Sequence, residues 1–129
     1  MAPNSSGWRK WDTPFYLARQ LANVELTARS TEMLVVEMQD LETTESFRIT
    51  FKSVLGFRFE KEANTQALMN SFIVRQSSWV SAMMQKPFRT KDISKAVHYI
   101  ISTMDGQLDV VCLERPRIET HPSKTSSEQ

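Results

Sequence analysis

Two histidines, His98 and His121, are the residues of this 129-residue chain that could serve as histidine bases or histidine metal ligands near neutral pH. His98 stands beside Tyr99 in an apolar segment, either as a structural imidazole or as an acid–base group. With two distant histidines and a single cysteine, Cys112, the sequence lacks the ligand spacing of a zinc site. Its three glycines form no phosphate-binding loop. We therefore predict no metal, no cofactor and no catalytic set, and leave enzyme activity open.

Basic side chains offer a first candidate binding surface. Arg48, Lys52 and Arg58 share one parity of an alternating segment, so they would project from one face of a sheet. Such a face could pair with an acidic protein or with phosphates, which makes nucleic-acid binding one alternative function. Glu37 and Gln39 could neutralise the face across the ladder. No aromatic stacking platform accompanies the basic residues, so we rank nucleic acid behind protein as a partner.

A local excess of acidic residues defines the second candidate surface. Glu37, Asp40, Glu42 and Glu45 lie close together in the sequence. Charge complementarity strongly governs protein association, so this segment would suit a basic partner such as a nuclease. We predict a non-enzymatic protein-interaction module, either an immunity-type inhibitor or a small homodimer.

A pocket is the alternative to a protein interface. Helices covering a sheet near His98, Tyr99 and Arg58 would bring these three side chains to one cleft. A convergent group of this kind in a deep pocket is typical of a small ligand-binding domain or an enzyme.

The elements that must position these residues begin with the segment from Phe47 to Glu60, where apolar and polar residues alternate. A period of two indicates a half-buried strand, with its phenylalanines on the core side. Gly56 within it marks a bend or bulge.

Turn and helix signals bound the remaining elements. We expect further strands over 24–29, 32–40, 97–103 and 108–114, and helices over 13–23, 61–74 and 77–85. Asp105-Gly106 between two apolar runs predicts a hairpin with a type I′ turn. About five antiparallel strands with grouped helices predict an α+β fold, with the helices packed on one face of a twisted sheet.

The composition fits one globular domain, which we place at 13–119, between a flexible segment over 1–12 and a disordered tail over 120–129. The chain is 40% apolar and 24% charged, which is ordinary for a soluble protein. Its net charge of +1 gives no general argument for nucleic acid or membrane. Apolar runs fall far short of the ~20 residues of a membrane span, and no secretory leader is visible. We expect a cytoplasmic protein without membrane contact.

Short motifs are spread over roughly the C-terminal two-thirds of the chain. They are Phe57-Arg58 with Glu62 downstream, Ser78-Trp79, His98-Tyr99-Ile100-Ile101, Asp109-Val110 and Pro116. Together they resemble small, largely uncharacterised bacterial proteins of the immunity-like type found in toxin loci. The resemblance implies an α+β domain that binds another protein, and it implies no catalytic residues.

Overall fold

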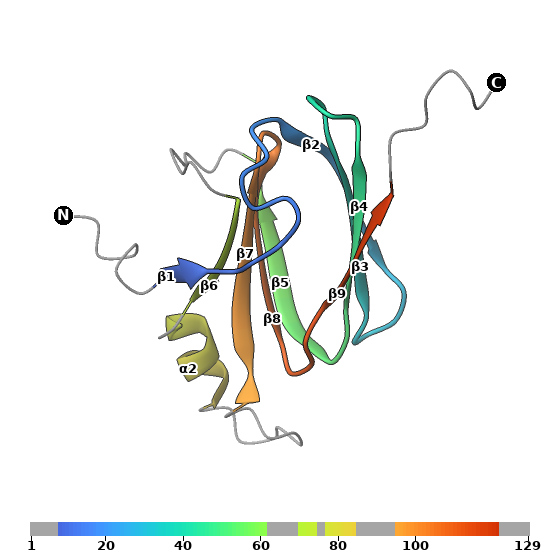
Figure 1. Ribbon diagram of the computed structural model, residues 1–129. Helices are drawn as coiled ribbons and strands as arrows, with labels where there is room; N and C mark the ends of the chain where they lie inside the picture. The colour runs from blue at the N-terminus through green and yellow to red at the C-terminus, as the bar shows by residue number, and fades with distance from the viewer. Residues whose placement is uncertain (1–7, 62–69, 75–76, 85–94, 122–129) are drawn as a thin grey trace.

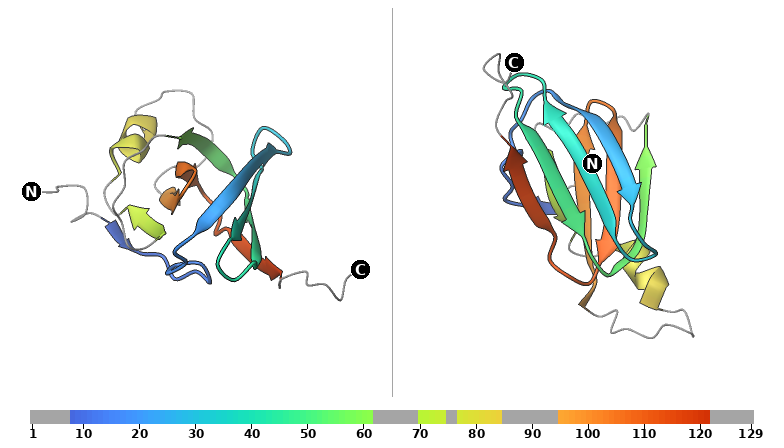
Figure 2. Two further views of the ribbon diagram at one scale, coloured as in Figure 1. Left: turned by 90° about the horizontal axis from the view of Figure 1, so that it is seen from above. Right: turned by 90° about the vertical axis from the view of Figure 1, so that its right-hand side faces the viewer.

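The computed structural model describes residues 8–61, 70–74, 77–84 and 95–121, which form two antiparallel β-sheets packed face to face (Figures 1 and 2). One sheet has five strands, in the order β1 (Trp8–Lys10), β6 (Ser71–Val74), β7 (Val97–Thr103), β8 (Gly106–Cys112) and β5 (Val54–Glu60). The other has four, in the order β2 (Leu21–Ala28), β3 (Leu34–Asp40), β4 (Ser46–Phe51) and β9 (Arg117–His121). A short helix, α2 (Ser78–Met84), lies on the outer side of the five-stranded sheet.

The core fills the space between the two sheets. Alternate side chains of each strand point into it, as the period of two requires. The four-stranded sheet contributes Leu34, Val36, Met38, Phe47, Ile49 and Phe51, and the five-stranded sheet contributes Tyr99, Ile101, Leu108, Val110 and Cys112. Two aromatic residues from the loop between β1 and β2 extend this core. Phe15 packs 5.3 Å from Phe47, and Trp11 packs 4.6 Å from Tyr99, between ring centroids.

The predicted α+β fold is wrong, because the described residues are mostly β. The helix expected over 13–23 is replaced by a turn and by the start of β2 at Leu21. The strands are confirmed as antiparallel, but they form two sheets rather than one sheet of about five strands. The helix expected over 77–85 is confirmed as α2.

The helix predicted over 61–74 is wrong where the structure describes it, since its last four residues are strand β6. Residues 62–69 lie outside the described part. The misleading signal was a spacing of four, between Leu68 and Phe72 and between Met69 and Ile73. Residues four apart share a face in a strand as well as in a helix, so this spacing does not separate the two.

The alternating segment from Phe47 to Glu60 is two strands, not one. β4 ends at Phe51 in the four-stranded sheet, and β5 begins at Val54 in the five-stranded sheet. Between them Ser53 has a φ of 54°, in the left-handed region where an extended strand cannot continue. A register shift between Val54 and Gly56 then changes which residues face the core, as a bulge does. The glycine was thus correctly predicted to mark an irregularity.

The hairpin predicted at Asp105-Gly106 is confirmed, although its turn is not type I′. Thr103 pairs with Gly106, so the central residues are Met104 and Asp105, and neither has a positive φ. Gly106 has a φ of 149°, and a Cβ there would lie 2.3 Å from the carbonyl oxygen of Glu60. Glycine is therefore required by the close approach of the end of β5.

Two observations bear on the chain ends. Residues 8–10 form β1 within the segment predicted to be flexible, and residues 122–129 of the predicted tail lie outside the described part. No helix in the described ranges has the length and apolar character needed to cross a bilayer.

Candidate functional site

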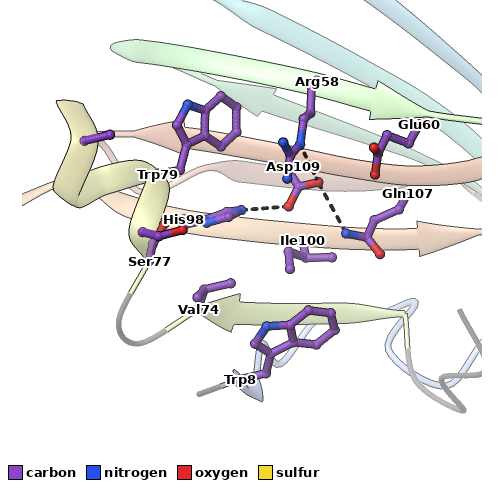
Figure 3. A pocket seen from close by; sticks show the side chains of 12 residues that line it. Trp8, Arg58, Glu60, Val74, Ser77, Trp79, His98, Ile100, Gln107 and Asp109 are labelled. Carbon is purple, nitrogen blue, oxygen red and sulfur yellow. Dashed lines mark hydrogen bonds and ion pairs between the residues drawn. The ribbon is translucent and has the colours of Figure 1, made fainter. Parts of the chain in front are cut away.

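A pocket of about 720 Å³ opens on the outer face of the five-stranded sheet, beside α2 (Figure 3). Residues directly opposed on antiparallel strands share a face. Arg58 on β5 lies opposite Asp109 on β8, which lies opposite Ile100 on β7. Their neighbours Tyr99 and Val110 point into the core, so this row faces away from it and into the pocket.

A chain of hydrogen bonds joins three elements at the wall of this pocket. Ser77 Oγ lies 2.7 Å from His98 Nδ1, and His98 Nε2 lies 2.7 Å from Asp109 Oδ1. Ser77 Oγ also accepts the backbone N–H of Val80 at 3.1 Å, as the N-cap of α2. Because an ionised carboxylate can only accept, the imidazole donates its Nε2–H to Asp109, and in the neutral ring Nδ1 accepts the hydroxyl proton of Ser77. All three side chains are buried, so the ring is held from both ends.

Asp109 is the most buried polar residue of the pocket wall, at 1% exposed. Its second oxygen, Oδ2, accepts from Gln107 Nε2 at 3.3 Å and from Arg58 Nε at 3.5 Å. Burial by itself would raise the pKa of this carboxyl group. The hydrogen bonds from His98 and Gln107, together with the charge of Arg58, outweigh burial and hold the pKa below its ordinary value of 3.8. Asp109 is therefore a carboxylate at neutral pH.

Two tryptophans border the pocket from opposite sides (Figure 3). Trp79 on α2 meets the His98 ring edge-on, with 5.6 Å between centroids, and Trp8 on β1 packs 4.9 Å from the Phe72 ring. The Arg58 guanidinium lies 5.2 Å from the Trp79 ring, a cation–π contact. The Arg58 side chain lines the pocket and is 59% exposed, so its guanidinium group is accessible to a ligand there.

The predicted pocket trio is only partly brought together. Arg58 and His98 line the pocket, as expected. Tyr99 is on the opposite face of β7, inside the core, where burial above all raises the pKa of its phenol to about 12. Burial likewise raises the pKa of the Cys112 thiol to about 12. Neither group ionises at neutral pH, and neither faces the pocket.

The predicted basic face is divided between the two sheets. Arg48 is on β4 of the four-stranded sheet, Arg58 is on β5 of the other, and Lys52 is exposed in the connection between them. Arg48 Nη2 lies 2.9 Å from Glu37 Oε2 on the neighbouring strand, so the predicted neutralisation across the ladder is confirmed for this pair. These three residues do not form one surface for a phosphate backbone.

We expect the Arg48–Glu37 pair to contribute little stability. Both side chains are more than 40% exposed, so water screens their attraction, and exposed pairs are worth about 0.2–1 kcal/mol. A double-mutant cycle with Arg48→Ala and Glu37→Ala, followed by urea denaturation, measures this coupling. A coupling well above about 1 kcal/mol would show that something covers this face in solution.

The acidic segment is partly occupied by internal contacts. Glu37 is paired with Arg48, as described above. Asp40 is buried, and its Oδ1 accepts the backbone N–H of Glu42 at 2.9 Å, which shapes the β3–β4 turn. Glu42 Oε2 also lies 3.6 Å from Arg19 Nη2, in an exposed ion pair. Glu45, in the same turn, has its carboxylate 3.5 Å from the hydroxyl of Thr43. The acidic surface left for a partner is smaller than the sequence indicates.

Sequence reasoning did not select Ser77, Gln107 or Asp109 as site residues. One signal for Asp109 was available, since a single carboxylate interrupts the apolar run from Leu108 to Cys112. Charged residues are almost never fully buried unless they are paired. Finding the partner required the β5–β8 and β7–β8 registers, which no local pattern discloses.

Within the described ranges, no group of three His, Cys, Asp or Glu side chains is placed to hold a metal ion. No family model, curated protein or solved structure matches this chain, so the function is argued from the geometry of the site.

Proposed function

We propose that the protein binds a small polar molecule in the pocket on the outer face of the five-stranded sheet. The observation that carries this proposal is the locked chain from Ser77 through His98 to Asp109, which forms the wall of an open pocket. Burying a carboxylate without a hydrogen-bonding or charged partner costs roughly several kcal/mol of folding free energy. Buried, paired titratable groups that face a cleft are concentrated at functional sites.

The lining indicates the chemistry of the ligand. Arg58 offers a planar, permanently charged group that suits a carboxylate, phosphate or carbonyl oxygen. Trp8 and Trp79 offer flat apolar surfaces for the remainder of the molecule. Glu60 at the rim disfavours ligands with a high negative charge. A small carboxylic acid or ester with a flat or cyclic part fits these requirements.

The three tryptophans provide a direct test. Trp8 and Trp79 line the pocket, whereas Trp11 packs in the core against Tyr99. Indole N–H resonances can be followed by NMR while a panel of aromatic and cyclic carboxylic acids, esters and monosaccharides is added. We expect a ligand to shift the signals of Trp8 and Trp79 and to leave that of Trp11 in place. If no compound shifts the two pocket signals, or if all three move together, the proposed site is wrong.

Arg58→Met should weaken binding of the ligand so found by about tenfold or more, because a hydrogen bond to a charged group contributes about 1.5–3 kcal/mol. Arg48→Met is the matched control, since Arg48 is on the other sheet and pairs with Glu37. Equal effects of the two substitutions would show that the ligand responds to net charge and not to the pocket.

The protein-interaction module remains a second candidate, favoured by one feature of the surface. Leu41 and Met104 are 41% and 63% exposed. Their backbone N–H groups donate to the carbonyl oxygens of Gln20 and Leu21, which are consecutive in the sequence, so Leu41 and Met104 lie near each other. Two apolar side chains are thus exposed at one end of the sandwich, beside the acidic turn. An inhibitor or homodimer role for this end, and a cytoplasmic location, stay predictions.

A further inference from the structure

We propose that Ser77 is a nucleophile and that the pocket hydrolyses a small ester. This inference rests on the proposed function, because it names a reaction for the same pocket. Its basis is the order of the three side chains: a serine hydroxyl bonded to an imidazole, and the imidazole bonded to a buried carboxylate. The same order of hydroxyl, imidazole and carboxylate activates serine for acyl transfer in unrelated folds, although there Nε2 faces the serine and Nδ1 the carboxylate, so the two ring nitrogens are exchanged here.

The distances suit proton transfer in both directions. Each of the two hydrogen bonds is 2.7 Å long, within the range needed between a nucleophile, its base and the group that orients the base. The imidazole is turned so that Nδ1 faces Ser77 and Nε2 faces Asp109. Either nitrogen can accept a proton when the other is protonated and hydrogen-bonded, so this orientation leaves the transfer intact.

Each residue then has a defined part in the reaction. Ser77 Oγ forms a bond to the acyl carbon of the ester while its proton moves to His98 Nδ1. The bond to the leaving oxygen breaks, and that oxygen takes the proton from Nδ1 to become an alcohol. A water molecule next attacks the acyl-serine and gives a proton to Nδ1, which returns it to Oγ as the carboxylic acid departs. The balance is one ester and one water consumed, one acid and one alcohol formed.

Asp109 is a positioning residue in this scheme. It accepts Nε2–H of His98, which fixes the ring and stabilises the imidazolium during each transfer. Gln107 and Arg58 hold its other oxygen. The backbone N–H of Val80 points at Ser77 Oγ and favours negative charge on that atom. A serine that served only as a helix cap would need the Val80 contact but not the buried imidazole and carboxylate.

A small alkyl fluorophosphonate tests the inference directly, because it forms a stable adduct with an activated serine. Oγ bonds to phosphorus, fluoride leaves, and the proton passes to His98. We expect one adduct per chain, mapped to Ser77 by mass spectrometry of peptides. Ser78 and Ser81 on α2 are exposed, yet they should stay unmodified, so they are internal controls for simple accessibility.

Variants separate activation from folding. His98→Gln should slow adduct formation at least 100-fold, since a positioned general base contributes about 10²–10⁴-fold. Ser81→Ala, on the exposed side of the same helix, should react at the rate of the unmodified protein. If His98→Gln does not fold, the adduct map of the unmodified protein decides alone.

Absence of an adduct at Ser77 in the folded, unmodified protein would overturn the proposal. So would reaction at Ser77 that is unchanged in a folded His98→Gln variant. If Ser77 is inert but ligands still shift Trp8 and Trp79, the pocket binds without turnover and the proposed function stands. If ligands leave both signals unmoved as well, both proposals fail.

Discussion

Replacing Asp109 by alanine is expected to lower the free energy of unfolding by about 3–5 kcal/mol, because it removes one partner of a buried, hydrogen-bonded pair. His98 Nε2–H would lose its acceptor, and Gln107 would lose the oxygen that it contacts. Arg58 contributes little to this cost, since its side chain is largely exposed. Urea denaturation at neutral pH measures the change. Asp12→Ala is the matched control, because that carboxylate is 90% exposed and should change stability by less than about 0.5 kcal/mol.

The pH dependence of stability provides a second measure of the same residue. The pKa of Asp109 is lowered in the folded state, so its stabilising contribution is fully present above its ordinary, unfolded value of 3.8. That contribution is lost as the pH falls through the folded pKa. The stability of Asp109→Asn should therefore approach that of the unmodified protein as the pH falls below about 4. A difference that stays constant from neutral pH down to acid would contradict a paired carboxylate at this position.

Several parts of the fold are visible in local sequence patterns. β3, α2 and the β7–β8 hairpin follow from alternation, helical spacing and an Asp-Gly pair, each within a few residues of its predicted bounds. The Arg48–Glu37 contact was also predictable, because it joins two strands that are consecutive in the chain. Neighbouring strands with a short loop have few alternative pairings, so sequence patterns constrain them well.

The predictions that were wrong concern features that depend on contacts between residues far apart in the sequence. Nothing local shows that the chain leaves one sheet at Ser53 and enters the other at Val54, because both strands keep the same alternation. The residues of the pocket are hard to predict from the sequence for the same reason. His98 and Arg58 were recognisable as chemical groups, but Asp109 joins them only through strand registers of the completed sheet. Ser77 was not selected from the sequence, because a serine at the start of a helix is typical of an ordinary N-cap.

Phe51→Ala and Phe57→Ala give the sharpest test of the change of sheet at Ser53. Both phenylalanines are on the same parity of the alternating segment, so one continuous strand would bury both. In the two-sheet fold Phe51 is 0% exposed in the core, whereas Phe57, on the edge strand β5, is 41% exposed. Truncating a fully buried phenylalanine costs about 3–5 kcal/mol, through lost burial and the cavity left behind.

We therefore expect Phe51→Ala to lower the free energy of unfolding by about 3–5 kcal/mol, and Phe57→Ala to lower it by a small fraction of that. Lys52→Ala, next to Phe51 but exposed, should change it by less than about 0.5 kcal/mol. Chemical denaturation of the three variants under one set of conditions gives the comparison. Equal losses at Phe51 and Phe57 would mean that both side chains are buried. That result would contradict the position of β5 as an exposed edge strand of the five-stranded sheet.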